Sequence, residues 1–380
     1  ELQLAWDESV LRVALGGSAG GKVSDEVTYS ADGRVATLMV TANFAGKDSL
    51  TIDSLHVTNI TKVSSETGME LRLWKDRVYQ VSEKTLRIGR LDLRLAQSQI
   101  FVVGDPTTEI DSVVIRENLV SAGITAGKEI RLVLPAEMGL QWDVGMEPII
   151  SGSEQEKIAD SRFADARTYQ LDISQDFEKG GMLVITDLYV TDFVYSSMPV
   201  GLLIQANSQG RTNVESDSTL AVAQPSFSSA FNQGFALGDE PMVVAAITII
   251  DDPHVAGITA NRDVRIVVPD SRAIKWDVTS EPTAKGDVRA TAKIINGDTL
   301  LVDVEENLAP GDTLVVSGAR MVFVDLFPRG NLQVSLNGGE TINLQDPFWI
   351  EVGKPSILTD RYHVFDIDER DGVLAGGTIR

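Results

Sequence analysis

The sequence predicts an all-β fold, with tandem antiparallel β-sandwich modules in a rod-like array. The first observation behind this prediction is an internal repeat. Phe101 to Pro148 recur as Phe235 to Pro282 at a constant offset of 134 residues, and both copies contain the run AGITA, at 122–126 and 256–260. The second observation is that the segments within each copy have the composition of β-strands. Repetition at a domain-sized period indicates a string of modules.

Runs rich in Val, Ile, Leu and Thr follow one another along the chain, separated by Gly, Asp, Asn and Pro. The predicted strands lie at 35–44, 49–57, 69–74, 129–135, 182–190, 201–206, 242–250, 263–269, 299–304, 313–318 and 332–337. Many of these runs alternate apolar and polar residues, and no sustained helical period interrupts them. Short strands at this spacing are typical of antiparallel sandwiches.

One hairpin signal occurs three times. Phe44 to Leu50, Phe177 to Leu183 and Leu308 to Leu314 each place an apolar residue six positions before a new strand, with a Gly- or Asp-containing turn between them. A glycine in such a turn allows the positive φ that a tight return requires. The three signals predict three copies of one hairpin, each facing the core of its own module.

Both ends of the chain carry parts of a module. The opening ELQLAWD aligns with Glu137 to Asp143, so the chain begins within a repeat. At the other end, Trp349 to Arg380 follows the pattern of Phe101 to Arg131, so the chain also stops within one. In this alignment only the five residues equivalent to Leu132 to Ala136 separate the end of the chain from its beginning.

These alignments divide the chain into four parts. The predicted parts are an incomplete β-sandwich module at 1–97 that lacks its first strands, complete modules at 98–231 and 232–346, and the first strands of a further module at 347–380. Two explanations fit the incomplete ends. The chain is a piece of a longer repeat protein, or 347–380 of one chain completes 1–97 of a neighbouring chain. An incomplete sandwich exposes unpaired strand edges that recruit strands, and a head-to-tail contact that does not close forms a fibre.

Composition excludes several classes of function. With 43% hydrophobic residues and a mean hydropathy of +0.01, the 380-residue chain is globular, and it contains no apolar run long enough for membrane insertion. The absence of cysteine rules out disulfides and thiol chemistry. A formal charge of -22 repels phosphate backbones and anionic lipids, so nucleic acid is not an expected partner.

A Trp-Asp pair occurs once in each of three modules, as Trp6-Asp7, Trp142-Asp143 and Trp276-Asp277. An indole at a fixed place in every copy predicts a core residue, and the following aspartate predicts a turn residue that accepts backbone N–H bonds. The alternative is an exposed aromatic platform for a sugar.

Acidic residues cluster at one loop that the alignments make equivalent between modules. The candidate ligands are Asp251 and Asp252 in one copy and Asp366, Asp368 and Asp371 in another, and Glu117-Asn118 stands at the same place in a third. Hard oxygen ligands of this kind are suited to Ca²⁺, the one cofactor that the sequence suggests. The alternative is that these acids are solvated turn residues without a metal.

The sequence shows no pattern typical of an enzyme. The three histidines, His56, His254 and His363, lack metal-ligand spacing. The chain contains no G-x-S-x-G motif and no P-loop, and no carboxylate pair stands out from the many acidic residues. We therefore expect a protein without catalytic residues.

The pattern IRLVLPxxxxLxWD at Ile130 to Asp143, followed by the hairpin FxxGxxLxI at Phe177 to Ile185, resembles the Ig-like β-sandwich repeats of bacterial and archaeal cell-surface proteins. This resemblance implies an extracellular, non-enzymatic structural element: a filament, a surface layer or an adhesin stalk. Its partners would be further copies of itself in a head-to-tail homopolymer, or neighbouring repeats of a longer chain. The alternative function is a carbohydrate- or protein-binding module, with a surface glycan as its partner.

Overall fold

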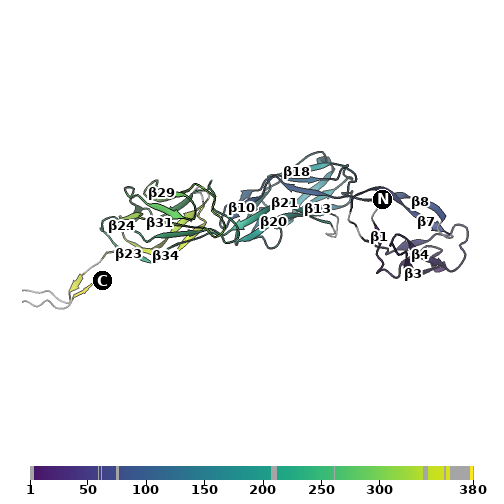
Figure 1. Ribbon diagram of the computed structural model, residues 1–380, viewed down its shortest axis with the longest axis horizontal. Coiled ribbons are helices and arrows are strands. Elements are labelled where there is room, and N and C mark those ends of the chain that lie inside the picture. The colour runs from purple at the N-terminus through teal and green to yellow at the C-terminus, as the bar shows by residue number, and fades with distance from the viewer. Residues whose placement is uncertain are drawn as a thin grey trace, which may run out of the picture.

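The computed structural model describes residues 4–58, 60, 62–73, 77–206, 212–260, 262–336, 341–354, 357–359 and 377–379. Within these residues the regular structure is β-strand, apart from two single-turn 3-10 helices at Gly20–Lys22 and Gln155–Lys157. Figure 1 shows the strands gathered into three bodies that follow one another end to end. The predicted all-β, rod-like array is confirmed. We name its parts the N-terminal module (4–89), the middle module (90–223), the third module (224–353) and the C-terminal segment (354–380).

The middle module is a sandwich with a six-stranded and a four-stranded sheet. The six-stranded sheet has the order β10 (Gln99–Val102), β21 (Thr212–Ala223), β20 (Ser197–Ala206), β13 (Glu129–Val133), β17 (Thr168–Ile173) and β16 (Ile158–Asp165). The four-stranded sheet has the order β15 (Ile149–Ser151), β18 (Met182–Thr186), β12 (Val113–Arg116) and β9 (Asp92–Leu95). A third sheet consists of β11 (Thr108–Glu109), β19 (Tyr189–Thr191) and β14 (Gln141–Trp142).

The third module repeats this arrangement strand for strand. Its six-stranded sheet is β23 (Gln233–Ala236), β34 (Leu344–Gly353), β33 (Phe327–Ser335), β26 (Val264–Val267), β30 (Thr299–Val304) and β29 (Ala290–Ile294). The other sheets are β22 (Ser226–Ser229), β25 (Ile247–Ile250), β31 (Thr313–Ser317) and β28 (Thr283–Gly286), and β24 (Met242–Val243), β32 (Arg320–Phe323) and β27 (Ile274–Trp276). The internal repeat of the sequence is therefore a repeat of the complete topology.

Alternation of side chains along each strand builds the cores. On the central strand β13, Ile130 and Leu132 are buried, whereas Glu129 and Arg131 form an ion pair of 2.7 Å on the outer face. Successive strand residues point to opposite faces, so one face of each sheet is apolar and packs on the other sheet. The sheets differ from the sequence prediction in one respect. One pair per module, β10 with β21 and β23 with β34, is parallel.

The N-terminal module contains four two-stranded sheets in its described residues. They are β1 (Ala5–Trp6) with β6 (Val57–Thr58), β2 (Ala14–Gly16) with β5 (Thr51–Asp53), β3 (Val23–Tyr29) with β4 (Ala36–Val40), and β7 (Ser64–Leu73) with β8 (Arg77–Ile88). These eight strands correspond in order and pairing to β14 through β21 of the middle module. Trp6 pairs with Val57, for example, as Trp142 pairs with Val190.

The sheets place the module boundaries differently from the sequence prediction. β9 pairs with β12 and β22 pairs with β25, so each complete module begins before the predicted starts at 98 and 232. The predicted boundary at 346 divides β34, which pairs with β33 and closes the third module. The module boundaries are set by pairing between strands that are distant in sequence. The sequence repeat alone does not reveal this pairing.

The alignment of the end of the chain with Phe101 to Arg131 is wrong for the same reason. Trp349 lies in the closing strand β34, opposite Asn331, and is not an equivalent of Phe101. In the C-terminal segment, β35 (Ile357–Thr359) pairs with β36 (Gly377–Ile379). The register Ile357↔Ile379 matches Phe227↔Ile249 of the third module. The segment 354–380 therefore corresponds without a gap to 90–116 of the middle module.

The two junctions between modules are built alike. A Cβ atom added to Gly89 would lie 2.6 Å from the backbone nitrogen of Gly123, and one added to Gly257 would lie 2.6 Å from the Cβ of Ala223. At the second junction, Arg262 also donates a hydrogen bond to the carbonyl oxygen of Ile100 (2.9 Å), and the Asn343 side-chain amide donates to Asp105 Oδ1 (3.0 Å). The end of each module thus packs directly on the AGITA loop of the next.

Candidate functional site

The N-terminal module presents strand edges that the complete modules cover. In the middle module, β13 lies between β17 and β20 and pairs with both. The corresponding strands of the N-terminal module are β4 and β7, and no described strand pairs with their facing edges. The edge of β5 that corresponds to the β12 side of β18 is likewise unpaired among the described strands. We call the unpaired edges of β4 and β7 the open slot.

Apolar side chains along these strands are exposed where their equivalents form a core. Met69 and Leu71 of β7 are 46% and 53% exposed, whereas Leu202 and Ile204, at the same positions of β20, are fully buried. Ile52 of β5 is 41% exposed, and its equivalent Ile185 is fully buried.

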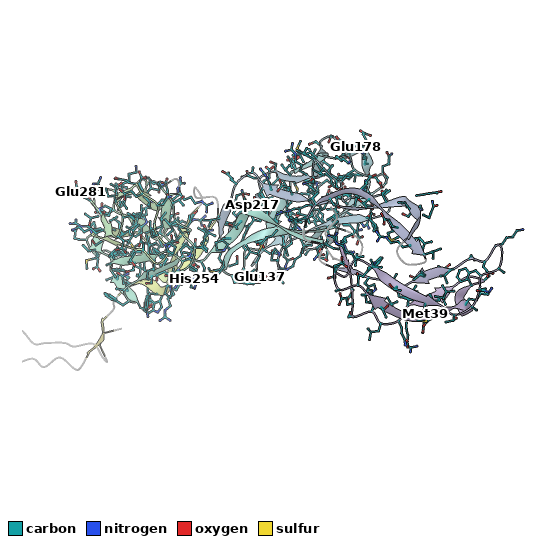
Figure 2. The ribbon with its side chains drawn as sticks, turned by 45° about the vertical axis from the view of Figure 1, so that its right-hand side comes forward. Met39, Glu137, Glu178, Asp217, His254 and Glu281 are labelled. Atoms are coloured by element: carbon teal, nitrogen blue, oxygen red, sulfur yellow. The ribbon has the colours of Figure 1, made fainter. Side chains whose placement is uncertain are left out.

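The same contrast extends to the hairpin signal in the sequence. Phe44 is 45% exposed, while Phe177 and Leu308 at the same place are buried. Met39 of β4, labelled in Figure 2, is 71% exposed, but its equivalent in the middle module is Asp172, which forms an ion pair with Arg162 on the outer face. Scattered exposed apolar residues are ordinary, but Met69, Leu71, Ile52 and Phe44 occupy positions that are buried in the complete modules.

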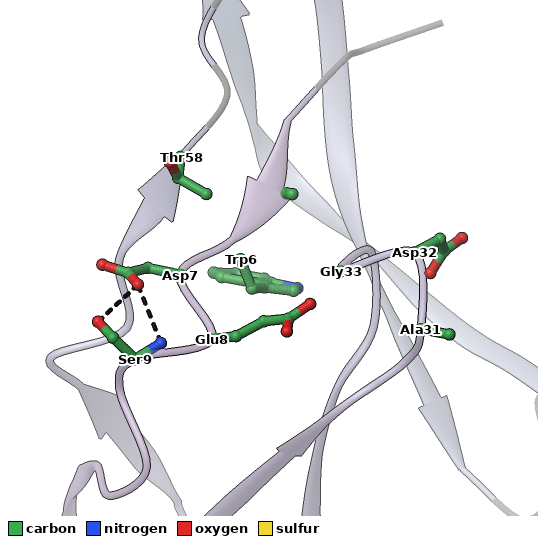
Figure 3. A pocket seen from close by; sticks show the side chains of 9 residues that line it. Trp6, Asp7, Glu8, Ser9, Ala31, Asp32, Gly33 and Thr58 are labelled. Atoms are coloured by element: carbon green, nitrogen blue, oxygen red, sulfur yellow. Dashed lines mark hydrogen bonds between the residues drawn. The ribbon is translucent and has the colours of Figure 1, made fainter.

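The tryptophans follow the same division. Trp142 and Trp276 are buried in the cores of the two complete modules, which confirms the prediction of a core residue. Trp6 is only half-buried and lies beside a hollow of about 400 Å³ that Glu8, Asp32, Gly33 and Thr58 also line. Figure 3 shows the indole of Trp6 between Glu8 and the loop that carries Gly33.

The aspartate after each tryptophan closes a turn, as predicted. Asp7 Oδ1 accepts hydrogen bonds from the backbone N–H and hydroxyl of Ser9 (3.0 and 2.6 Å), which Figure 3 shows as dashed lines. Asp277 Oδ1 accepts the same two bonds from Thr279 (3.0 and 2.7 Å), and Asp143 Oδ1 accepts one from the N–H of Gly145 (3.0 Å). Hydrogen bonds from the hydroxyl and backbone groups lower the pKa of Asp7 and of Asp277.

The acidic loop residues of the complete modules bind backbone amides. Asp251 accepts N–H bonds from Asp252, Gly257 and Ile258 (2.8, 2.9 and 3.2 Å). Glu117 at the equivalent position accepts them from Gly123 and Ile124. Burial raises the pKa of Glu117 and of Asp251, although the amide bonds act in the opposite direction. These carboxylates hold the AGITA loop in place.

Asp252 ties the start of the third module to the loop that carries His254. Its Oδ1 accepts N–H bonds from His254 and Val255 (2.8 and 3.1 Å), and its Oδ2 accepts one from Gln224 at the start of the third module (2.9 Å). The loop with His254 lies near the meeting of the two complete modules in Figure 2. His254 contacts Asp252 through its own backbone N–H.

Of the five predicted calcium ligands, only two lie in the described part of the chain. Asp251 and Asp252 adjoin one another, and their oxygens are engaged with loop amides. Asp366, Asp368 and Asp371 lie outside the described residues. Among those that are described, no three His, Cys, Asp or Glu side chains gather as a metal site. Calcium stays a prediction.

The sequence reasoning predicted an incomplete first module but did not identify the open slot. The signal that could have found it is the pairing order of the repeat, because β13 pairs with both β17 and β20, the equivalents of β4 and β7. The described chain also contains no helix long and apolar enough to cross a membrane.

Comparison with known proteins yields similarities of structure only. No family model matches the sequence, and no curated protein matches it. Among solved structures, the C-terminal domain of the Streptococcus agalactiae AgI/II polypeptide BspA is similar with 10% identity and a TM-score of 0.37, covering 69% of this chain and 99% of that one. The collagen adhesin CNA from S. aureus has 10% identity and a TM-score of 0.23, covering 69% and 92%.

A third similar structure is the C-terminal fragment of the major pilin GBS80 of Streptococcus agalactiae, with 9% identity and a TM-score of 0.25, covering 68% of this chain and 90% of that one. These structures belong to the class of bacterial surface proteins that the sequence resembles. At such low TM-scores the similarity is one of fold only, and it assigns no function to this chain.

Proposed function

We propose that the protein is a non-enzymatic structural or adhesive element of the cell exterior, part of a filament, a surface layer or an adhesin stalk. The observation that carries this proposal is the end-to-end repetition of one module with one kind of junction. At each junction the end of a module packs on the AGITA loop of the next. Such a chain gains length with each added module, because every module contacts only its neighbours.

An antibody raised against the purified chain tests the location. It should label intact cells of the source organism, and brief protease treatment of those cells should remove the label. Labelling that requires permeabilised cells would contradict an exterior role. Electron microscopy of the labelled material would then distinguish fibres, a lattice and single stalks.

The alternative of a carbohydrate-binding module gains no support from the described surface. Sugar platforms need flat rings exposed in a row. The large aromatic side chains most exposed among the described residues are Phe44, Tyr195 and Phe231, and each belongs to a different module. We therefore favour the structural role over the binding role.

We further propose that copies associate head to tail. The C-terminal segment corresponds to 90–116, and those residues carry β9 and β12 in the middle module. By the register of β12 with β18, β36 of one copy would pair with β5 of the next, with Thr378 opposite Thr51. The unpaired edge of β5 and the exposed Ile52 support this contact.

Paired cysteines test the head-to-tail contact, because the chain has none of its own. A mixture of Thr51→Cys and Thr378→Cys chains should form a disulfide-linked dimer under mild oxidation. A mixture of Thr37→Cys and Thr378→Cys chains is the matched control, since Thr37 lies on β4 of a different sheet. Equal dimer yields from the two mixtures would reject the predicted register.

A further inference from the structure

The six-stranded sheet of the third module ends in a free strand edge. β29 is the last strand of this sheet, and Figure 1 shows it along the upper side of the module. No described strand pairs with its outer side. The equivalent strand of the middle module, β16, is likewise the last in its sheet, and that module has a further module on each side along the chain. The free edge is therefore a property of the topology of the module.

The backbone of β29 offers a regular row of hydrogen-bonding groups along this edge. On the inner side, the N–H of Ile295 donates to the carbonyl oxygen of Thr299 (3.1 Å), and the register with β30 is unbroken back to Ala290. Alternate residues of a strand direct their backbone groups to opposite sides. Ala290, Ala292 and Ile294 therefore direct their N–H and C=O groups outward, where no described strand meets them.

The edge strand of the middle module is protected, whereas β29 is not. The register of β16 with β17 shifts twice, between Ile158 and Asp160 and between Phe163 and Asp165. Bulges and charged side chains keep a sheet edge from pairing with another chain. β29 contains neither a bulge nor an acidic residue. Of the two equivalent edges, the one in the third module is thus suited to accept a further strand.

The charged side chains beside the two edges differ as well. In the middle module, Arg162 Nη1 forms ion pairs with Asp160 (2.7 Å) and Asp172 (2.6 Å) on the outer face of the sheet. In the third module Lys293 stands at the place of the arginine, and a threonine stands at the place of the first aspartate. Asp303 keeps the second aspartate, but no ion pair joins it to Lys293 in the described part of the chain. Both charges are left for a partner.

We propose that β29 is a lateral contact between two copies of this chain, which pair edge to edge and antiparallel about a two-fold axis at Ala292. In this register Ala290 lies opposite Ile294 of the second copy, and Ala292 lies opposite its own counterpart. The outward groups of all three residues then meet and form roughly six backbone hydrogen bonds. A shift by one residue would set outward groups against inward ones, so the strand is complementary to itself in this register.

The charges favour a second copy over an unrelated strand. In the proposed register Lys293 of one copy lies opposite Thr291 of the other, and Thr291 is itself opposite Asp303. Lys293 is then two strand spacings, about 9.6 Å along the sheet, from Asp303 of the other copy, which the two side chains can bridge. The ion pair that the middle module makes within itself would be made between copies of the third module, once on each side of the axis.

Paired cysteines test the register in the full chain. A mixture of Thr291→Cys and Lys293→Cys chains should form a disulfide-linked dimer under mild oxidation, because side chains opposite one another on adjacent strands have Cβ atoms about 4.5–5.5 Å apart. A mixture of Asp160→Cys and Arg162→Cys chains, with the equivalent positions of β16, is the control and should stay monomeric. Equal dimer yields from the two mixtures would overturn the proposal.

Proline variants test the backbone contact. Ala292→Pro removes an outward N–H at an edge position that proline tolerates, and in both cysteine chains it should lower the dimer yield at least about tenfold. Ser161→Pro at the equivalent position of β16 should leave the yield unchanged. The head-to-tail disulfide between Thr51→Cys and Thr378→Cys chains should form equally with and without Ala292→Pro, which separates the two contacts. A dimer yield that Ala292→Pro does not lower would overturn the proposal.

A charge exchange tests the occupant without changing the backbone. Lys293→Glu should weaken self-association at least about threefold in sedimentation equilibrium, because the new carboxylate faces Asp303 of the second copy. The double variant Lys293→Glu with Asp303→Lys should restore the association of the natural chain. Association that responds to neither the single nor the double variant would reject a second copy as the occupant of this edge.

Discussion

At the scale of single residues, buried carboxylates act as organisers of loops. Asp251 accepts two backbone N–H groups from the AGITA loop, those of Gly257 and Ile258, and these are equivalent to the partners of Glu117 in the preceding module. Buried amides without an acceptor are costly, so the acid is needed wherever the loop is buried at a junction. This explains why acidic residues recur at the same place in the sequence.

Replacing Asp251 with Ala should destabilise the third module by about 2–4 kcal/mol, because the buried amides lose their acceptor. Urea unfolding of the full chain, followed by circular dichroism, measures the change. Glu281→Ala is the control, since Glu281 is exposed on the same module, and it should change stability by less than about 0.5 kcal/mol. A similar effect of both substitutions would contradict the role of Asp251.

The contribution of Asp251 should also depend on pH. Burial raises its pKa in the folded state above the ordinary 3.8, so the native chain binds more protons than the unfolded chain in the interval above 3.8. The stability difference between the natural chain and Asp251→Ala should therefore be largest below this interval and decrease as the pH rises through it. Unfolding measured at several pH values from about 3.5 upward checks the sign.

Calcium is tested by chelation. If Asp251, Asp252 or the acids Asp366, Asp368 and Asp371 hold Ca²⁺, removal of the ion with EDTA should lower the melting temperature, because a ligand that binds the native state stabilises it. Readdition of Ca²⁺, but not of Na⁺ at equal ionic strength, should restore it. A melting temperature that is unchanged by EDTA and by readdition of Ca²⁺ would contradict the calcium prediction.

At the scale of elements, the strand that precedes each predicted boundary belongs to the module that follows. β9 pairs with β12 along its whole length, and Leu93 and Leu95 are buried in the middle core. β22 has the same place in the third module through its pairing with β25. The linkers between modules are therefore short, since β22 begins at Ser226, soon after β21 ends at Ala223.

A chain that covers 90–223 should accordingly be more stable than one that covers 98–223. The shorter chain loses three buried leucines, Leu91, Leu93 and Leu95. Burial of each contributes about 1.5–3 kcal/mol, and together they are a large part of the stability of a small domain. Thermal unfolding followed by circular dichroism compares them. Leu93→Ala in the full chain serves as a second measure, and coincident melting curves for the two fragments would restore the boundary at 98.

At the scale of the whole molecule, side-chain contacts between modules stiffen the rod. Arg262 and Asn343 of the third module donate hydrogen bonds to Ile100, Val103 and Asp105 of the middle module. Val102 also packs in the core cluster of the third module. Contacts of this kind, together with the short crossing between modules, oppose bending at the junction.

The double substitution Arg262→Ala and Asn343→Ala should loosen this junction. Small-angle X-ray scattering should show a broader distribution of interatomic distances, while the circular dichroism of the strands stays unchanged. Arg289→Ala, an exposed arginine of the same module, is the control. An unaltered distance distribution in the double variant would show that backbone packing alone holds the modules in line.

Features that depend on local pattern could be predicted from the amino-acid sequence. Alternating apolar residues indicated strands, the 134-residue repeat indicated modules, and the Trp-Asp pairs indicated core and turn positions, because all of these depend on neighbours in the chain. Which strand belongs to which module depends on pairing between segments that are distant in sequence. Sequence letters placed Trp349 on Phe101, whereas pairing with β33 places it at the close of the third module. The open slot depended on the same information, because an uncovered strand edge is visible only when the pairing partners of each strand are known.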